Sequence, residues 1–239
     1  MSRHARHHAL RQVGESGQQK IGDARVLIIG VGGIGCAAAS YLASSGVGQL
    51  TLNDFDTVDA TNLGRQILFT PDDVGANKAT TAATRLAAMN PDIQITVVAD
   101  RLAADAMASA VANADVVLDG SDNFATRFLV NDACVTAGVC LVSGAAIRLE
   151  GQVAVFGPDY TSSPCYRCLY EDADESLDNC AGNGVLAPVP GAIGAMMAVE
   201  ALKHIVGLPS PRGRLQLYDA GDGSFRGVNV TKRPDCPSC

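Results

Sequence analysis

Short apolar runs alternate with longer helical segments over the first 145 residues of the chain. The apolar runs predict buried strands over residues 26–29, 50–53, 93–98, 116–118 and 140–143. The segments between them predict helices over residues 35–43, 79–89, 103–113 and 124–137. Because regular alternation of strands and helices is typical of parallel sheets with crossover helices, this part is predicted to be a Rossmann-like α/β unit.

The pattern changes after residue 145. Three further strands are predicted over residues 152–156, 215–218 and 225–230. Their connections do not supply regular crossover helices, which predicts that these strands extend the same sheet in antiparallel fashion. An acidic loop over residues 165–186 and a helix from Pro188 to about Val206 lie between them.

These elements predict a single domain over residues 1–239. Its nucleotide-binding half covers about 20–145, and its antiparallel half, with the acidic crossover loop, covers about 146–239. Residues 1–20 are polar and predict a partly helical arm that is exposed to solvent.

Composition narrows the possible classes of protein. A chain of 239 residues with 47% hydrophobic content can bury one large core. Its net charge of -7 and pI near 5.0 argue against a general nucleic-acid surface, which needs clustered Lys and Arg. No uncharged apolar run of membrane-spanning length and no apolar signal core is present in the sequence. We therefore expect a cytoplasmic protein that binds neither nucleic acid nor membrane.

A glycine-rich turn, Gly30-Val31-Gly32-Gly33-Ile34-Gly35, joins the first predicted strand to the first predicted helix. Glycines at such a turn let backbone amides approach a phosphate at a helix N-terminus. Asp54 ends the second strand, where its carboxylate could bind both ribose hydroxyls. This pair of features suits NAD as well as ATP, and the alternative is a tight turn with no ligand.

Polar residues beyond Asp54 favour a triphosphate. Asn62, Arg65 and Gln66 lie in one polar stretch, and Lys78 begins a helix, where a cation is unfavourable unless an anion accompanies it. A triphosphate would supply that anion and the charge that develops on cleavage. Asp122, at the end of the fourth strand, is a candidate Mg²⁺ ligand. Asp122 or Asn123 could instead cap the helix that follows.

The eight cysteines fall into three groups. Three lie in apolar contexts and are predicted to be buried core thiols: Cys36, Cys134 and Cys140. Four form two Cys-x-x-Cys pairs: Cys165 with Cys168, and Cys236 with Cys239. This spacing predicts a closed, structural Zn²⁺ site that tethers the C-terminus to the main body, and redox or incidental pairs are the alternative. The remaining thiol, Cys180, lies in the acidic loop.

The motifs together resemble the MoeB/ThiF family, bacterial relatives of ubiquitin-activating enzymes. The resemblance rests on Gly30 to Gly35, Asp54-Phe55-Asp56, Asn62-Leu63-Gly64-Arg65-Gln66, Lys78, Asn90-Pro91, Val117 to Asn123, Ser143 to Arg148, Cys165-Tyr166-Arg167-Cys168-Leu169 and both Cys-x-x-Cys pairs. It covers nearly the whole chain and is far more specific than the glycine turn alone.

The resemblance implies a homodimeric adenylyltransferase. In this family the C-terminal glycine carboxylate of a ubiquitin-like sulfur carrier ending in Gly-Gly attacks the α-phosphate of ATP, giving an acyl-adenylate and pyrophosphate. A sulfur donor, such as a cysteine desulfurase or a rhodanese, then supplies the thiocarboxylate sulfur.

The resemblance also implies roles for individual residues. The nucleotide contacts would be Gly30, Gly32, Gly33, Asp54, Asn62, Arg65, Gln66, Lys78, Asp122 and Asn123. Arg65 and Lys78 would bind the phosphates, and Asp122 would bind Mg²⁺. Arg6 matches an arginine that reaches the ATP of the neighbouring subunit. Cys180 matches a cysteine that forms a persulfide linkage in ThiF-type members and is dispensable in MoeB-type members.

The sequence leaves two choices open. The carrier could be of the ThiS type, for thiamin, or of the MoaD type, for molybdopterin, because different segments resemble each branch. Two other classes share the glycine turn: an NAD-dependent oxidoreductase, and a catalytically silent nucleotide-binding scaffold.

Overall fold

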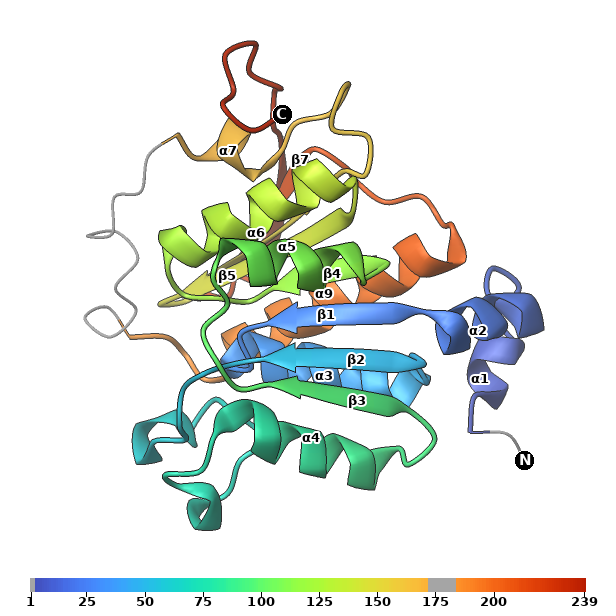
Figure 1. Cartoon of the computed structure of the whole chain (residues 1–239), viewed down its shortest axis with the longest axis vertical. Coiled ribbons are helices and arrows are strands. Elements are labelled where there is room, and N and C mark those ends of the chain that lie inside the picture. Colours follow the sequence, from blue (N-terminus) through green and yellow to red (C-terminus); the bar gives the residue numbers. More distant parts are fainter. Residues whose placement is uncertain (1–2, 172–183) are drawn as a thin grey trace.

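The computed structural model describes residues 3–171 and 184–239, which form a mixed sheet covered by helices on both faces (Figure 1). The sheet has eight strands in the order β3-β2-β1-β4-β5-β6-β7-β8. The strands are β1 (Arg25–Ile29), β2 (Gln49–Asn53), β3 (Gln94–Val98), β4 (Val116–Asp119), β5 (Cys140–Ile147), β6 (Glu150–Phe156), β7 (Arg214–Asp219) and β8 (Ser224–Asn229). The helices of the main body are α3 (Gly33–Ser45), α4 (Lys78–Met89), α5 (Ala104–Ala112), α6 (Phe124–Ala137), α7 (Tyr166–Leu169) and α9 (Pro188–Val206).

The direction of pairing changes once across the sheet, as predicted. Strands β1 to β5 pair in parallel, and β5 to β8 pair in antiparallel fashion. Strand β5 is longer than predicted because it continues into a hairpin with β6, where Ile147 pairs with Glu150. Arg148, in the two-residue turn, has φ 53°, a left-handed conformation that tight hairpin turns require.

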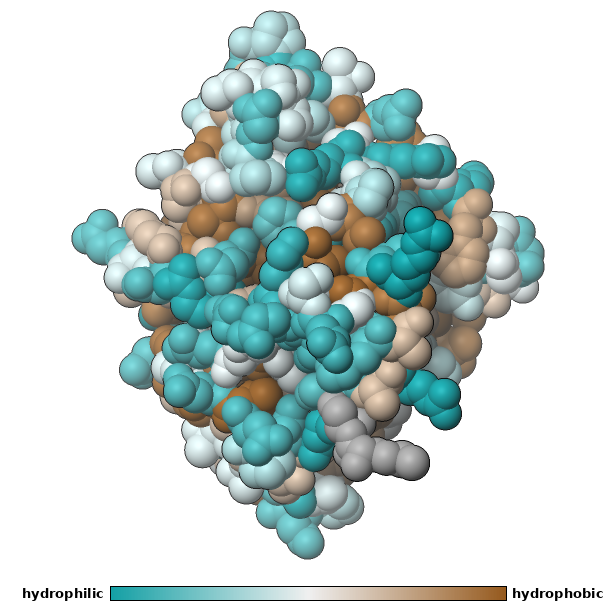
Figure 2. Space-filling view, turned by 90° about the vertical axis from the view of Figure 1, so that its right-hand side faces the viewer, coloured by the Kyte–Doolittle hydropathy of each residue, from teal (hydrophilic) through white to brown (hydrophobic). Residues whose placement is uncertain are grey.

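Side chains alternate between two cores because successive residues of a strand point to opposite faces. Val26 and Ile28 of β1 pack in the core beneath α3, α4 and α9. Leu27 and Ile29 pack in the core beneath α5 and α6. Figure 1 shows α5 and α6 in front of the sheet and α3 and α9 behind it. The space-filling view shows mainly polar side chains, with small apolar areas between them (Figure 2).

The N-terminal segment differs from the predicted solvent-exposed arm. It folds into α1 (Ala5–His8), which has no buried residue, and α2 (Gly14–Asp23), which buries Gly17 and Ile21. Ile21 belongs to the core that contains α9, and Lys20 Nζ donates to the Val206 carbonyl. The second helix is therefore part of the packed body, because Gly17 allows its close approach to Val206 of α9.

Helix α9 is long and apolar enough to cross a membrane by length and composition alone. Its residues Ile193, Met197 and Ala201 are buried in the core against the sheet. We therefore interpret α9 as a core helix.

Candidate functional site

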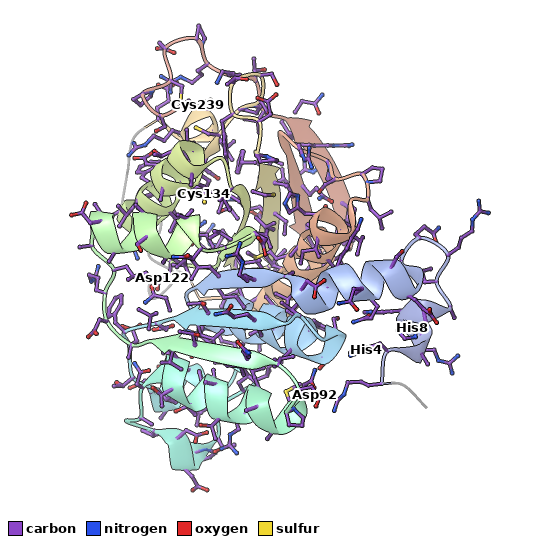
Figure 3. All side chains as sticks on the ribbon, turned by 45° about the vertical axis from the view of Figure 1, so that its right-hand side comes forward. His4, His8, Asp92, Asp122, Cys134 and Cys239 are labelled. Carbon is purple, nitrogen blue, oxygen red and sulfur yellow. The ribbon has the colours of Figure 1, made fainter. Side chains whose placement is uncertain are left out.

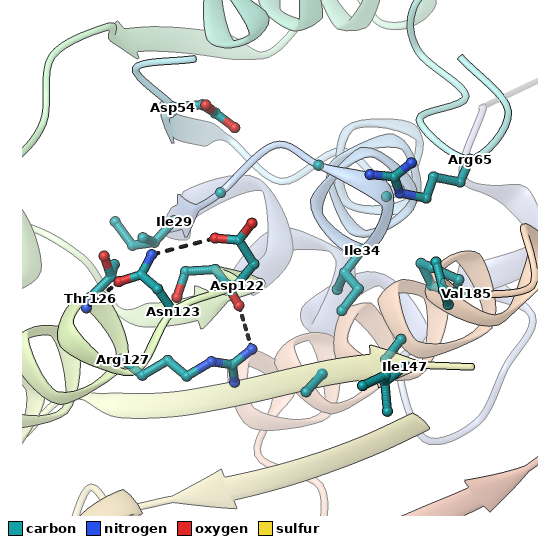
Figure 4. A pocket seen from close by; sticks show the side chains of 18 of the residues that line it. Ile29, Ile34, Asp54, Arg65, Asp122, Asn123, Thr126, Arg127, Ile147 and Val185 are labelled. Carbon is teal, nitrogen blue, oxygen red and sulfur yellow. Dashed lines mark hydrogen bonds between the residues drawn. The ribbon is translucent and has the colours of Figure 1, made fainter. Parts of the chain in front are cut away.

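A cavity of about 600 Å³ lies at the carboxyl ends of the parallel strands, between the glycine turn, the loop after β4 and the β5–β6 hairpin (Figure 4). This edge is where nucleotides bind in open α/β sheets. All ten residues predicted to contact the nucleotide line it: Gly30, Gly32, Gly33, Asp54, Asn62, Arg65, Gln66, Lys78, Asp122 and Asn123. Residues that are far apart in the sequence thus meet in one cavity.

The glycine turn is shaped by two close backbone approaches. Gly30 has φ +80°, and a Cβ at this position would lie 3.1 Å from the backbone of Gly120. A Cβ on Gly35 would lie 1.9 Å from the Gly30 carbonyl oxygen, so only glycine fits between the turn and the helix. Helix α3 begins at Gly33, and its first amides face the cavity edge without a side-chain cap.

Asp54 fixes this turn from the end of β2. Its carboxylate oxygens accept the Val31 amide at 2.8 Å and the Asp56 amide at 2.9 Å. Burial raises the pKa of the Asp54 carboxyl, although the amides of Asp56 and Val31 and the charge of Lys78 act in the opposite direction. Since a carboxylate can accept about four hydrogen bonds, two acceptor sites are left for ribose hydroxyls.

Lys78 has an anionic partner within the protein. Its Nζ lies 3.1 Å from Asp56 Oδ2, and its side chain is 10% exposed, against 53% for Asp56. Asn77 caps α4 through the Thr80 amide and holds the carbonyls of Asp54 and Asp56 with its side-chain amide. The sequence predicted an anion beside Lys78, and in this structure Asp56 fills that place.

Arg65 borders the glycine turn, next to Gly33. It follows the short helix η1 (Ala60–Asn62), and its Nη1 donates to the Thr61 carbonyl at 3.1 Å. Figure 4 shows the guanidinium over the start of α3. Arg65 and Lys78 line the same cavity as the turn, so a phosphate bound there could meet both cations.

The structure shows which of the two candidate residues, Asp122 or Asn123, caps α6. Asn123 Oδ1 accepts the Thr126 amide at 2.9 Å, so Asn123 is the N-cap. Asp122 is exposed, and its Oδ1 accepts a long bond of 3.4 Å from Asn123 Nδ2. In Figure 4 the Asp122 carboxylate points toward the glycine turn. Helix capping therefore does not explain why an aspartate stands at position 122.

Arg127 also belongs to the site, although its sequence context did not predict it. This residue is 5% exposed, lines the cavity and donates to the Ser121 and Gly144 carbonyls, the latter at 3.2 Å. It thereby joins the loop after β4 to strand β5. Its position four residues after the cap Asn123 places it on the same helix face, which was the available signal.

The half of the cavity away from the glycine turn is less polar. It is lined by Ala145, Ala146, Ile147, Gly151, Gln152, Tyr170, Val185 and Leu217, with Glu150 as its charged residue. Tyr170 and Gln152 are hydrogen-bonded to each other at 2.8 Å. The small side chains of Ala145 and Ala146 on β5 leave this part of the cavity open beside the sheet.

Two predicted site residues are not in this cavity. Arg6 is exposed on α1, and Figures 1 and 3 place this helix at the opposite end of the sheet from Asp122. Arg6 is therefore not brought to the cavity of its own chain. Cys180 lies outside the described residues.

The two Cys-x-x-Cys pairs come together beside the middle of α6. The sulfurs of Cys165, Cys168, Cys236 and Cys239 all lie within 4.8 Å of one another. The distances from Cys165 to Cys236 and from Cys168 to Cys239 are 3.6 Å. A tetrahedral Zn²⁺ site with about 2.3 Å metal–sulfur bonds requires about 3.8 Å between sulfurs, so the thiolate set fits the metal.

The three other described cysteines are buried, as predicted. Cys36, Cys134 and Cys140 are each at most 1% exposed. Burial raises the pKa of the Cys36 and Cys140 thiols to about 12. These thiols are inert parts of the core.

A model of the ThiF family matches residues 4–238. The sulfur carrier protein ThiS adenylyltransferase of Escherichia coli (strain K12) is 44% identical over 237 residues, covering 99% of this chain and 94% of that protein. The molybdopterin-synthase adenylyltransferase of Salmonella typhimurium is 46% identical over 240 residues, covering 100% of this chain and 96% of that protein.

Solved structures agree with the sequence relatives. E. coli MccB with MccA-N7isoASN has a TM-score of 0.86 at 26% identity and covers 100% of this chain and 75% of that chain. E. coli MccB with ATP has a TM-score of 0.82 at 27% identity and covers 93% of this chain and 68% of that chain. Because the family model spans nearly the whole sequence and full-length relatives share 44% and 46% of its residues, the chain belongs to the ThiF family.

Proposed function

We propose that this protein is an adenylyltransferase that activates the C-terminal glycine of a ubiquitin-like sulfur carrier with ATP, giving an acyl-adenylate and pyrophosphate. The observation that carries the proposal is the single cavity in which the glycine turn, Asp54, Arg65, Lys78 and Asp122 meet. Relatives named as ThiS and molybdopterin-synthase adenylyltransferases support it. Hydride transfer and a silent scaffold have no such support.

The chemistry needs alignment and charge neutralisation more than proton transfer. A carboxylate nucleophile is already ionised at neutral pH, so no general base is required. In-line attack on the α-phosphate puts negative charge on the phosphoryl oxygens and on the leaving pyrophosphate. Arg65 and Lys78 would neutralise that charge, while the amides at Gly32 and Gly33 and the carboxylate of Asp54 would hold the nucleotide.

The less polar half of the cavity, beside β5 and β6, supplies a place for the second substrate. Ala145 and Ala146 line it with small side chains. A carrier tail ending in Gly-Gly is narrow enough to enter this half and bring its carboxylate to the phosphates. Gln152 and Tyr170 offer hydrogen bonds to its backbone.

Two metal ions belong to the proposal. Mg²⁺, held by Asp122, would neutralise phosphate charge and orient the triphosphate for in-line attack. Zn²⁺, held by Cys165, Cys168, Cys236 and Cys239, would have a structural role because four thiolates leave no open coordination position.

The remaining proposals concern the domain, the oligomeric state, the sulfur donor and the pathway. We take residues 1–239 as one adenylyltransferase domain that works as a cytoplasmic homodimer, in which Arg6 of one subunit reaches the cavity of the other. Sulfur would come from a cysteine desulfurase or a rhodanese, and Cys180 would form the persulfide linkage in a ThiF-type cycle. The thiamin and molybdopterin branches stay open because their relatives match at 44% and 46% identity.

The function is tested by exchange of labelled pyrophosphate into ATP. Exchange is expected only when ATP, Mg²⁺ and a carrier ending in Gly-Gly are all present, because the acyl-adenylate must form before it can be reversed. A carrier lacking its last glycine is the control and should support no exchange. ATP binding without adenylate formation on ThiS- or MoaD-type carriers would favour a silent scaffold, and displacement of ATP by a nicotinamide cofactor would favour an oxidoreductase.

Zinc removal gives a separate prediction. Chelation is expected to lower the melting temperature by about 8–16 °C, because a metal at about 1,000 times its Kd adds about 4 kcal/mol to a domain of this size. The measurement is thermal unfolding, together with elemental analysis of protein purified without added metal. Cys239→Ser is the control, since chelator should leave its already lowered melting temperature unchanged. Absence of zinc would contradict the four-thiolate site.

A further inference from the structure

Two adjacent side chains on α6, Asn131 and Asp132, contact both Cys-x-x-Cys pairs. We propose that they are positioning residues that hold the two cysteine pairs in the geometry of the four-thiolate metal site. This inference rests on the zinc site proposed above, and does not depend on the adenylylation chemistry.

Asn131 fixes the first cysteine pair. It is fully buried, and its Oδ1 accepts the backbone amide of Tyr166 at 2.8 Å. Its Nδ2 lies 3.7 Å from Cys165 Sγ, a hydrogen bond to sulfur, and 3.0 Å from Asp132 Oδ1. One side chain thus sets the backbone of the first pair, orients a ligand sulfur and orients the neighbouring carboxylate.

Asp132 joins the two pairs through the residues between their cysteines. Arg167, in Cys165-Tyr166-Arg167-Cys168, donates from Nε at 3.0 Å and from Nη2 at 3.1 Å. Ser238, in Cys236-Pro237-Ser238-Cys239, donates its hydroxyl to Oδ1 at 2.6 Å. The Arg167 guanidinium also packs over the Phe128 ring at 4.1 Å, which holds it against α6. One carboxylate therefore links both pairs to the same helix.

The hydrogen bond from Ser238 to Asp132 helps to order the C-terminal segment. Strand β8 ends at Asn229, and the ten residues from 230 to 239 include no helix or strand, so secondary structure does not bring Cys236 and Cys239 to the site. Ser238 is 106 residues from Asp132 along the chain, and ordering such a segment costs conformational entropy. A hydrogen bond to a carboxylate that is already held by Arg167 lowers that cost before the metal binds.

A positioning role can be distinguished from general stabilisation, because the hydrogen bond between Asp132 and Ser238 can be removed by substitution of either residue. Substitution of residues that orient metal ligands typically costs about 10- to 100-fold in metal affinity. Asp132→Ala removes the link from α6, and Ser238→Ala removes it from the C-terminal segment. If the link acts as described, the two changes affect the same interaction and their effects are not additive.

The experiment measures zinc affinity of the full-length protein by competition with a chromophoric chelator. Asp132→Ala and Ser238→Ala are each expected to weaken zinc binding about 10-fold or more, with the double variant little weaker than Asp132→Ala. Asp105→Asn is the control and should keep wild-type affinity, because Asp105 is an exposed carboxylate in the first turn of α5.

The possible results distinguish this inference from the zinc site itself. Zinc affinity within twofold of wild type in both single variants, or fully additive losses, would overturn the positioning role while leaving the zinc site in place. Wild-type protein that binds no zinc would overturn both, and pyrophosphate exchange would still test the adenylylation separately. If Asp132→Ala does not fold, Ser238→Ala alone carries the same expectation, since it changes only one hydroxyl, on a partly buried residue outside the helices and strands.

Discussion

Replacing Lys78 with alanine is expected to slow carrier-dependent ATP–pyrophosphate exchange by about 100- to 1,000-fold, the usual cost of removing one preorganised group that stabilises transition-state charge. Lys78 Nζ is held 3.1 Å from Asp56 with only 10% of its side chain exposed, so it projects into the cavity in a defined direction. Because the leaving pyrophosphate gains charge during the reaction, we expect kcat to fall more than the apparent affinity for ATP.

Lys20→Ala is the matched control for Lys78→Ala. Lys20 is an exposed lysine on α2, where its Nζ donates to the Val206 carbonyl away from the cavity. Lys20→Ala should leave the rate of carrier-dependent ATP–pyrophosphate exchange unchanged. The melting temperature of Lys78→Ala should fall by only a few degrees, because the partner left behind, Asp56, is 53% exposed and can be solvated by water. Exchange at the wild-type rate in Lys78→Ala would remove this lysine from the catalytic machinery.

The strands of the sheet were predictable because apolar runs carry most of the information on buried strands. Seven of the eight agree with the structure to within two residues at each end, and the exception is β5, predicted over 140–143 and observed over Cys140–Ile147. Gly144, Ala145 and Ala146 have low strand propensity, but they pair with Gln152 and its neighbours on β6. Tertiary pairing decides such a segment, and no local pattern reports it.

The site was predictable where a motif combined glycines with charged residues, and not where the informative residue lay inside an apolar helix. Asp54 and Asp122 lie in the loops that follow β2 and β4, and Lys78 begins α4, so their place at the sheet edge follows from the topology. Arg127 and Asn131 lie on α6 among apolar neighbours, and their spacing of four and eight residues from the cap Asn123 is too weak a signal to mark a buried polar side chain. Their partners are backbone groups on other elements, which only the folded chain brings near.

Replacing Asp122 with asparagine is expected to slow the exchange reaction by about 100-fold or more and to raise the Mg²⁺ concentration needed for half-maximal rate. Asparagine keeps the size of the side chain but loses the charge that a hard divalent cation prefers. The α6 cap should survive, because Asn123 and not Asp122 accepts the Thr126 amide. The melting temperature should therefore stay within about 2 °C of wild type, since exposed substitutions usually change stability by less than 0.5 kcal/mol.

A magnesium titration of the exchange rate separates a metal ligand from a residue that simply adds negative charge to the cavity. Removing a repulsive carboxylate that binds no metal would tighten ATP binding and leave the Mg²⁺ dependence unchanged. Removing a ligand shifts the titration to higher Mg²⁺ and slows the reaction at saturation, because the triphosphate loses its orientation. Asp23→Asn, which changes an exposed carboxylate on α2 that pairs with Gln19, should reproduce the wild-type titration. An Asp122→Asn titration that overlays the wild-type curve would show that this carboxylate does not hold the metal.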